Sequence, residues 1–368
     1  MARFGAGLAA DADLIRAAER AADEALATLG GRRPDLACIF VSGAEPDQVA
    51  AAGLRAMQRC AAAASIGCNG PGVLASGRAI EAANAVAVWC AVLPDVRIRT
   101  FHLEVLPAAD GMAVVGLPER GDDDVVGVLL ADPWSFPVDG FVARSNEALT
   151  GLPFVGGCAT GWLGRGSTRL FLNGEAVDRG AVGALLAGPV GARAVVSQGC
   201  RPIGPAMTVT AADGNVLLEL AGAPALEKLE QIILGLDPES QALAATGLQV
   251  GIAMDEYADE HGLGDFLVRG IAGGDPDRRG LVVGDLVPVG RTIQFQLRDA
   301  NAADEDLRRT LRAFRSGPVD TVEGALLFSC NGRGGQMFTA ADHDVVVLGE
   351  ELSVDAVAGF FAAGEIGP

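Results

Sequence analysis

The chain has 368 residues, of which 50% are hydrophobic, and a mean hydropathy of +0.31. That length exceeds a typical single core, so two domains are expected. The formal charge of −19 and the pI of about 4.5 disfavour nucleic acid and anionic membrane surfaces as partners. No window reaches the roughly 18 uninterrupted apolar residues that a membrane span needs.

The N-terminal third begins with a helix, a strand and a second helix. Asp11 or Asp13 can cap the first helix, and Gly30-Gly31 can end it. Residues 36–42 are typical of a buried strand, and Pro46 is suited to the first position of the following helix. Because no signal peptide precedes this pattern, we expect a cytoplasmic protein.

A glycine-rich pattern then occurs three times, each time after an apolar run and a crossover segment. Each copy consists of an apolar residue and a glycine, then four other residues, then a second segment that begins with glycine. The first copy is Ile66-Gly67 with Gly72-Val73-Leu74, the second is Val155-Gly156 with Gly161-Trp162-Leu163, and the third is Ala358-Gly359 with Gly364-Glu365-Ile366. One copy alone would be interpreted as a tight turn between packed strands. Three copies in one frame favour a shared pocket at strand ends, where backbone can approach a ligand closely.

The middle of the chain predicts a hairpin and then a domain boundary. Residues 207–211 and 216–220 flank an Asp213-Gly214 turn, a strong signal for a tight β connection. Pro224 starts a helix, and here we place the boundary between a first domain, residues 1–221, and a second, residues 222–368.

Cysteine and histidine usage argues against cofactors. The seven cysteines contain no Cys-x-x-Cys motif, so free thiols in a reducing cytosol are expected. The three histidines, His102, His261 and His343, are too far apart in sequence to assemble a metal site from spacing. We therefore expect no metal and no cofactor.

Three motifs carry a resemblance that spans nearly the whole chain, from about residue 36 to Pro368. They are Ser-Gln-Gly-Cys-Arg-Pro-Ile-Gly at 197–204, Phe-Ser-Cys-Asn-Gly-Arg-Gly at 328–334, and the final Ala-Gly-Phe-Phe-Ala-Ala-Gly-Glu-Ile-Gly-Pro. They resemble FIST proteins, which join an N-terminal FIST domain to a C-terminal one. Chains of that family continue past the last motif into a closing strand, whereas this sequence stops at Pro368.

The resemblance implies a bacterial sensory protein for signal transduction whose ligand is small, with amino acids proposed for the family. The sequence contains no kinase, cyclase or receiver domain, so any output is expected to pass to a downstream signalling protein. The ligand, that partner and the oligomeric state are not defined by the sequence.

The residues themselves indicate a pocket for an amino acid or a small carboxylate between the two domains. The turn around Asn331 and Arg333 offers N–H groups and a guanidinium to a carboxylate, and Glu365 could hold an ammonium. The remaining candidates line the glycine loops or the 197–204 motif: Gly67, Cys68, Gly72, Gly156, Gly157, Cys158, Thr160, Gly161, Gln198, Cys200, Arg201 and Gly364. Surface ion pairs are the alternative role for Arg333 and Arg201.

Two other functions stay open. A cysteine-dependent enzyme could use Cys158 or Cys200, but neither has a histidine nearby in sequence and buried packing is the common state of cysteine. A scaffold for protein partners could use Trp134 and Trp162 as anchors. The expected architecture is α/β: two related domains whose mixed sheets face each other between helices, in αββα layers. Two separate three-layer domains with parallel sheets are the alternative.

Overall fold

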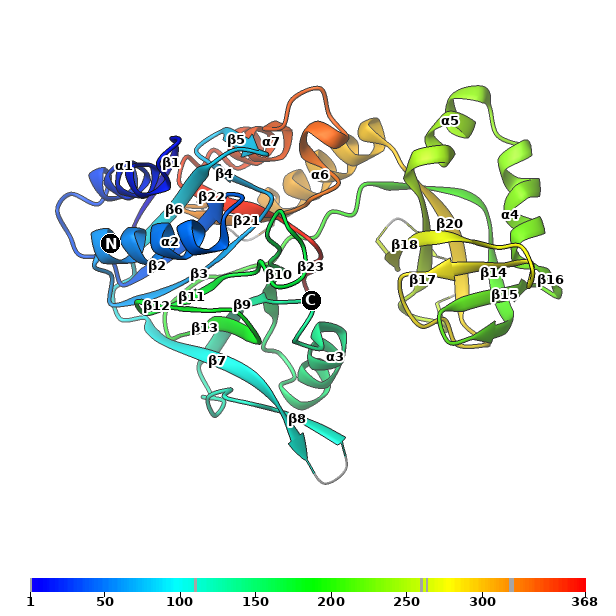
Figure 1. Ribbon diagram of the computed structural model, residues 1–368, viewed down its shortest axis with the longest axis horizontal. Helices are drawn as coiled ribbons and strands as arrows, with labels where there is room; N and C mark the ends of the chain where they lie inside the picture. The colour runs from blue at the N-terminus through cyan, green and yellow to red at the C-terminus, as the bar shows by residue number, and fades with distance from the viewer. Residues whose placement is uncertain (1, 109–110, 259–260, 263, 318–320) are drawn as a thin grey trace. The chain divides into compact units, whose positions relative to one another are not determined.

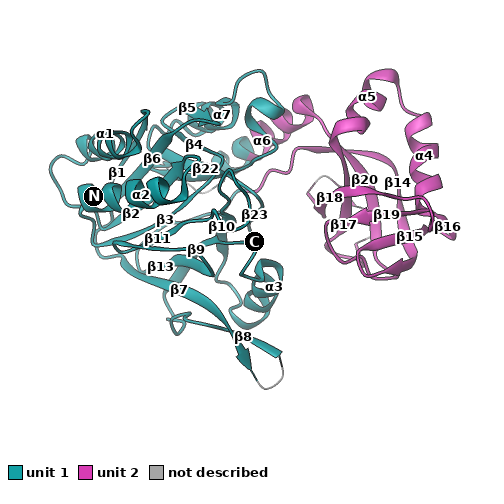
Figure 2. Ribbon diagram, viewed as in Figure 1, with its two compact units in different colours: residues 1–195, 311–368 teal, residues 196–310 magenta. Residues whose placement is uncertain are grey.

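The computed structural model describes residues 2–108, 111–258, 261–262, 264–317 and 321–368. The chain forms two compact units (Figure 2): unit 1 comprises residues 1–195 and 311–368, and unit 2 comprises residues 196–310. The α/β class and the presence of two domains are confirmed. The predicted boundary after residue 221 divides the sequence into two domains and stays a prediction. The chain passes from unit 1 to unit 2 between residues 195 and 196, and returns to unit 1 between residues 310 and 311.

The first sheet of unit 1 has the strand order β1-β6-β2-β3-β11-β12. Helices α1 (Leu14–Ala27) and α2 (Pro46–Cys60) cover one of its faces (Figure 1). Asp13 caps α1 by accepting a hydrogen bond from Ile15 N, as expected for one of the two candidate caps. The strands are β1 (Arg3–Ala10), β2 (Leu36–Ser42), β3 (Ala64–Asn69), β6 (Ala85–Val92), β11 (Leu170–Leu172) and β12 (Glu175–Val177).

The second sheet of unit 1 has the order β23-β10-β9-β13-β7-β8. Helix α3 (Val138–Ala148) packs on its outer face through a cluster that includes Phe141 and Phe154. The strands are β7 (Arg97–Ala108), β8 (Gly111–Val115), β9 (Asp124–Ala131), β10 (Phe154–Cys158), β13 (Ala181–Ala187) and β23 (Glu365–Ile366).

A third, four-stranded sheet has the order β21-β22-β4-β5. Helix α7 (His343–Leu352) connects its strands β21 and β22. One apolar core joins the inner faces of all three sheets, with Phe40 stacked on Phe360 at 5.4 Å between ring centroids. The αββα layers therefore occur inside unit 1. The strands are β4 (Gly72–Ala75), β5 (Arg78–Glu81), β21 (Ala325–Cys330) and β22 (Val357–Ala362), and a short 3₁₀ turn, η1, covers Gly334–Gln336.

The three glycine-rich copies correspond to three interlocked βαβ units. The parallel pairs β2/β3, β9/β10 and β21/β22 are each joined by a helix, α2, α3 or α7. After each pair the chain crosses to another copy: β4 pairs with β22, β11 with β3, and β23 with β10. All three glycine loops thus follow strands, as predicted, and each copy completes the sheet of another.

The first glycine of each copy is required by strand packing. A Cβ on Gly67, Gly156 or Gly359 would lie 2.2, 1.8 or 1.7 Å from a carbonyl oxygen of the parallel neighbour strand. No side chain fits at these distances, so these glycines belong to close strand contacts.

Unit 2 is a closed antiparallel barrel, which differs from the mixed sheet expected in a second domain. The order β14-β20-β17-β18-β19-β15 closes through the β14–β15 pair, the predicted hairpin, and every pairing is antiparallel. Its elements are β14 (Cys200–Asp213), β15 (Val216–Leu220), β16 (Ala223–Pro224), α4 (Ala225–Leu234), α5 (Pro238–Gly247), β17 (Leu248–Ala253), β18 (Phe266–Asp275), β19 (Gly280–Val283), β20 (Thr292–Arg298) and the start of α6 (Ala300–Arg315).

Candidate ligand-binding site

Unit 2 contains a cavity of about 130 Å³ beside strand β20. Ile293, Phe295 and Leu297 fill the barrel core, so the alternation of the strand directs Gln294 and Gln296 to the outer face, where the cavity lies. The described lining residues are Gln198, Gly199, Cys200, Pro202, His261, Gly262, Gly264, Phe266, Gln294, Gln296 and Asp306.

Gln296 is the most unusual of these residues. Its side chain is buried, with 4% exposure, yet it makes no hydrogen bond to any described residue. Glycine at position 251 leaves room for it, because a Cβ there would lie 2.5 Å from Gln296 Nε2. The amide atoms of Gln296 are not among the fully enclosed polar atoms that lack a partner in the described part of the chain, so they reach the cavity, where they can donate to and accept from a bound polar group.

Hydrogen bonds hold the rest of the cavity wall in place. Asp306 Oδ2 accepts from Ser197 Oγ at 2.6 Å and from Gln198 N at 3.2 Å, which fixes the 197–198 segment against α6. Gln198 Nε2 donates to Phe266 O at 2.6 Å, and this bond ties the same segment to the start of β18. The wall is therefore preformed from three separate parts of the sequence.

Arg201, a predicted ligand-binding residue, does not line this cavity. Its Nε donates to Asp299 Oδ2 at 3.1 Å and its Nη2 to Ser240 Oγ at 2.8 Å. This guanidinium forms the ion pair that the sequence left open as its alternative role.

In unit 1 the second and third glycine loops meet at the ends of β10 and β22. Cys158 N donates to Gly364 O at 2.7 Å, and Ala363 N donates to Cys158 O at 2.9 Å. Glu365 pairs with Gly157 across the β10/β23 ladder. The second and third loops are therefore close together, as expected. Their proximity arises because β23, at the end of the third loop, pairs with β10, which leads into the second.

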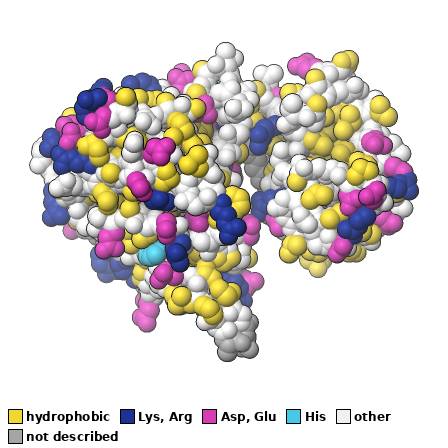
Figure 3. Space-filling model, in the orientation of Figure 1, with side chains coloured by type: hydrophobic (Ala, Val, Ile, Leu, Met, Phe, Trp, Pro, Cys, Tyr) yellow, Lys and Arg dark blue, Asp and Glu magenta, His cyan; other side chains and the backbone are white. Residues whose placement is uncertain are grey.

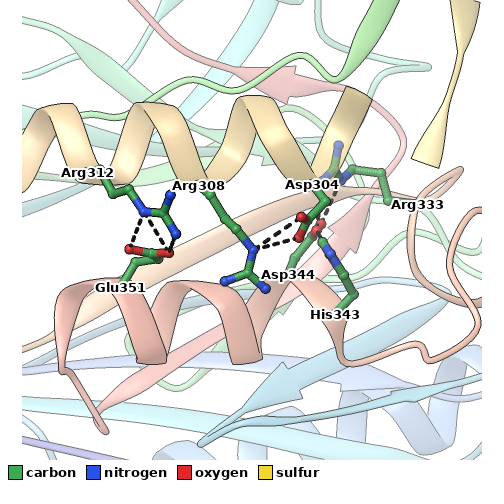
Figure 4. A network of polar contacts seen from close by, with 7 residues as sticks. All are labelled: Asp304, Arg308, Arg312, Arg333, His343, Asp344 and Glu351. Carbon is green, nitrogen blue, oxygen red and sulfur yellow. Dashed lines mark hydrogen bonds and ion pairs between the residues drawn. The ribbon is translucent and has the colours of Figure 1, made fainter. Parts of the chain in front are cut away.

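Arg333 is buried close to these loops, but its guanidinium is bound to an internal carboxylate. Its Nε and Nη2 each donate to Asp344 at 2.7 Å (Figure 4). Ser329 Oγ donates to the same carboxylate at 2.7 Å. Burial alone would lower the pKa of Arg333, but the hydrogen bond and charge of Asp344, with the nearby charges of Cys330 and Glu365, raise it. A carboxylate ligand at Arg333 would have to share the guanidinium with Asp344.

The carboxylate of this pair is equally well held. Burial works against its charged form, but hydrogen bonds from His343, Arg333 and Ser329 outweigh that effect and hold the pKa of Asp344 well below its usual range. Of the three guanidinium nitrogens of Arg333, Nη1 alone is buried without a hydrogen-bond partner among the described residues.

The fifteen residues predicted from the sequence divide between the units, so an inter-domain pocket stays a prediction. Gln198, Cys200 and Arg201 belong to unit 2, and two of them, Gln198 and Cys200, line its cavity. The others belong to unit 1: Gly67, Cys68, Gly72, Gly156, Gly157, Cys158, Thr160, Gly161, Asn331, Arg333, Gly364 and Glu365.

Sequence reasoning missed most of the cavity wall. His261, Phe266, Gln294, Gln296 and Asp306 were not among the candidates, and all five line the cavity. The alternation of residues 292–298, with two glutamines on the face opposite three apolar residues, was the available signal.

The surface gives no sign of a dominant positive patch on the view drawn. Figure 3 shows acidic and basic side chains interspersed on that face of each unit, in a chain with a formal charge of −19. Within the described ranges, no helix combines the length and apolar character needed to cross a membrane.

The structure is thus a two-domain α/β chain with a preformed polar cavity in unit 2. The family model of the FIST N domain matches residues 35–223 and that of the FIST C domain matches residues 225–368, so the chain belongs to the FIST family. FIST domains are associated with ligand binding in sensory signalling.

Two mycobacterial proteins are similar over the whole chain. The uncharacterized protein Rv0628c of Mycobacterium tuberculosis is 42% identical over 367 residues, which cover 100% of this chain and 95% of that protein. The uncharacterized protein Mb0898c of Mycobacterium bovis is 40% identical over 366 residues, covering 100% and 94%.

Proposed function

We propose that this chain is a sensory protein that binds an amino acid or another small carboxylate in the cavity of unit 2 and passes the signal to a protein partner. The observation that carries the proposal is Gln296, whose side chain is largely buried, lines the cavity and makes no hydrogen bond to a described residue. Family membership supports the sensory role.

The size of the cavity supports a small ligand. Its 130 Å³ is close to the volume of an engineered cavity of about 150 Å³ that holds one benzene molecule. The enclosed part of the ligand therefore has about six non-hydrogen atoms, which is the size of alanine. A location in the cytoplasm is part of the proposal, and it is supported by the seven cysteines, all within the described ranges, none of which forms a disulfide.

Replacing Gln296 by leucine is expected to weaken ligand binding by about 1–3 kcal/mol, because the ligand loses a buried hydrogen-bond partner of similar size. Isothermal titration of the full chain with a panel of small L-amino acids and carboxylates measures this loss. Gln241→Leu, on exposed α5 of the same unit and outside the cavity, is the matched control and should bind as the natural chain does. If no panel member binds, or if Gln296→Leu binds unchanged, the proposal is wrong.

We propose further that Cys158 packs in the fold and performs no catalysis. All seven cysteines lie within the described ranges. Cys158 is buried, with 8% exposure, whereas Cys330 is partly exposed and the other five are buried. In the native protein iodoacetamide is expected to modify Cys330 well before Cys158, because the thiolate needs access as well as charge to react. Mass spectrometry of timed samples measures both rates. Faster labelling of Cys158, or a turnover abolished by Cys158→Ser without loss of stability, would favour an enzyme.

A further inference from the structure

The polar groups that line the cavity of unit 2 are dominated by hydrogen-bond acceptors. None of the described lining residues is Arg or Lys, and the one lining residue with a permanent charge at neutral pH is the acid Asp306. Recognition by a fixed cation is therefore not available from the described lining residues, and it falls to the amides, the imidazole and Asp306.

Two glutamines have already used part of their donor capacity. Gln198 Nε2 donates to Phe266 O at 2.6 Å, and Gln294 Nε2 donates to Gly204 O at 2.8 Å. Each amide nitrogen keeps one N–H, whereas no hydrogen bond to either carbonyl oxygen is formed within the described part of the chain. Each Oε1 therefore retains both of its lone pairs.

His261 adds a further acceptor. Its Nε2 lies 2.8 Å from Asp255 O, and a carbonyl oxygen can only accept, so Nε2 carries the proton. In the neutral ring the other nitrogen, Nδ1, is then an acceptor. Asp306 is compensated by its contacts with Ser197, Gln198 and Arg309, and it contributes acceptor oxygens without adding a donor.

We infer that the group recognised in this cavity is an amine, and that the ligand class is small primary amines, of which amino acids are one kind. This inference rests on the proposed function, because it names the ligand group that the same cavity reads. An ammonium has three donors and no acceptor, which is the complement of carbonyl oxygens and an imidazole nitrogen. The unpartnered amide of Gln296 can accept from the same group.

Three probes of equal size separate the amine from the carboxylate. L-alanine has both groups, L-alaninamide keeps the amine and lacks the carboxylate, and isobutyrate keeps the carboxylate and has a methyl in place of the amine. In titrations of the full chain, L-alaninamide should bind within about threefold of L-alanine, and isobutyrate at least about tenfold more weakly, the ratio for one lost buried hydrogen bond.

A variant gives the second readout. Gln294→Met removes one acceptor from a half-exposed position and should weaken L-alaninamide by about fivefold while leaving isobutyrate unchanged, with Gln241→Leu as the control. Isobutyrate binding as tightly as L-alanine while L-alaninamide fails would overturn the inference and leave the proposed function standing. Binding of none of the three also overturns it, and the proposed function falls with it only if the whole panel of amino acids and carboxylates fails.

Discussion

Asp344→Ala is expected to destabilise unit 1 by about 3–5 kcal/mol, the usual cost of leaving a buried charge without its partner. The side chains of Arg333 and Asp344 are 9% and 7% exposed, and two hydrogen bonds of 2.7 Å join them. Without Asp344 the guanidinium would stay buried with Nε and Nη2 unpaired. Ser329 Oγ, which donates to the same carboxylate, would lose its acceptor as well.

Denaturant unfolding followed by tryptophan fluorescence measures this effect in unit 1, because all three tryptophans, Trp89, Trp134 and Trp162, belong to that unit. Asp23→Ala is the matched control: Asp23 pairs with Arg59 at 2.6 Å, but both side chains are 51% exposed. Exposed pairs contribute about 0–1 kcal/mol. A loss below about 1 kcal/mol for Asp344→Ala would contradict the assigned role.

The same pair predicts a pH dependence. The pKa of folded Asp344 lies below that of an unfolded aspartate, about 3.9, so the stabilisation is fully present above that value and is lost as the pH falls toward the folded pKa. The free energy of unfolding of the natural chain should therefore fall steeply below about pH 4. Asp344→Asn should show a smaller fall over the same range.

Gly359→Ala is expected to destabilise unit 1 by about 1–3 kcal/mol or more, since overpacking at a central strand forces the backbone to move. The added Cβ would lie 1.7 Å from Leu327 O, and β22 is bonded on both sides, to β21 and to β4. Separating the strands would weaken both ladders. The tryptophan-monitored unfolding described above gives the loss.

Gly140→Ala is the control for this substitution. Gly140 lies in α3, its Cβ would meet no atom within 4 Å, and alanine there should stabilise the helix by up to about 1 kcal/mol. Equal effects of the two substitutions would show that the strand contact at Gly359 has no special role.

The βαβ units could be predicted from the sequence because their signals are local. The run from Leu36 to Ser42 is uniformly apolar, as expected for a strand buried on both faces, and Pro46 marks the helix after it. The exchange of strands between copies could not be predicted, because β4, β11 and β23 are short and their partners lie about 100 or more residues away. The antiparallel barrel was missed because its closure depends on the pairing of β14 with β20, two strands that lie far apart in the sequence.

The candidate site was predicted only in part. Gln198 and Cys200 stand in a distinctive motif and do line the cavity, whereas the Gln294 and Gln296 pair is a weak signal in an ordinary strand pattern. The role of Arg333 depends on Asp344, eleven residues later and on a different element. Sequence shows that both residues are present, but only the fold shows that the guanidinium is bound.

The most direct test of the central claim is an NMR titration of the full chain that follows the side-chain amide of Gln296, assigned with the Gln296→Leu variant. The indole N–H of Trp89, which donates to Ala356 O inside unit 1, is the internal reference. The account predicts that a small amino acid shifts the Gln296 amide resonances to saturation while the Trp89 resonance stays in place. Saturable binding that moves unit 1 resonances and leaves Gln296 unchanged would contradict it.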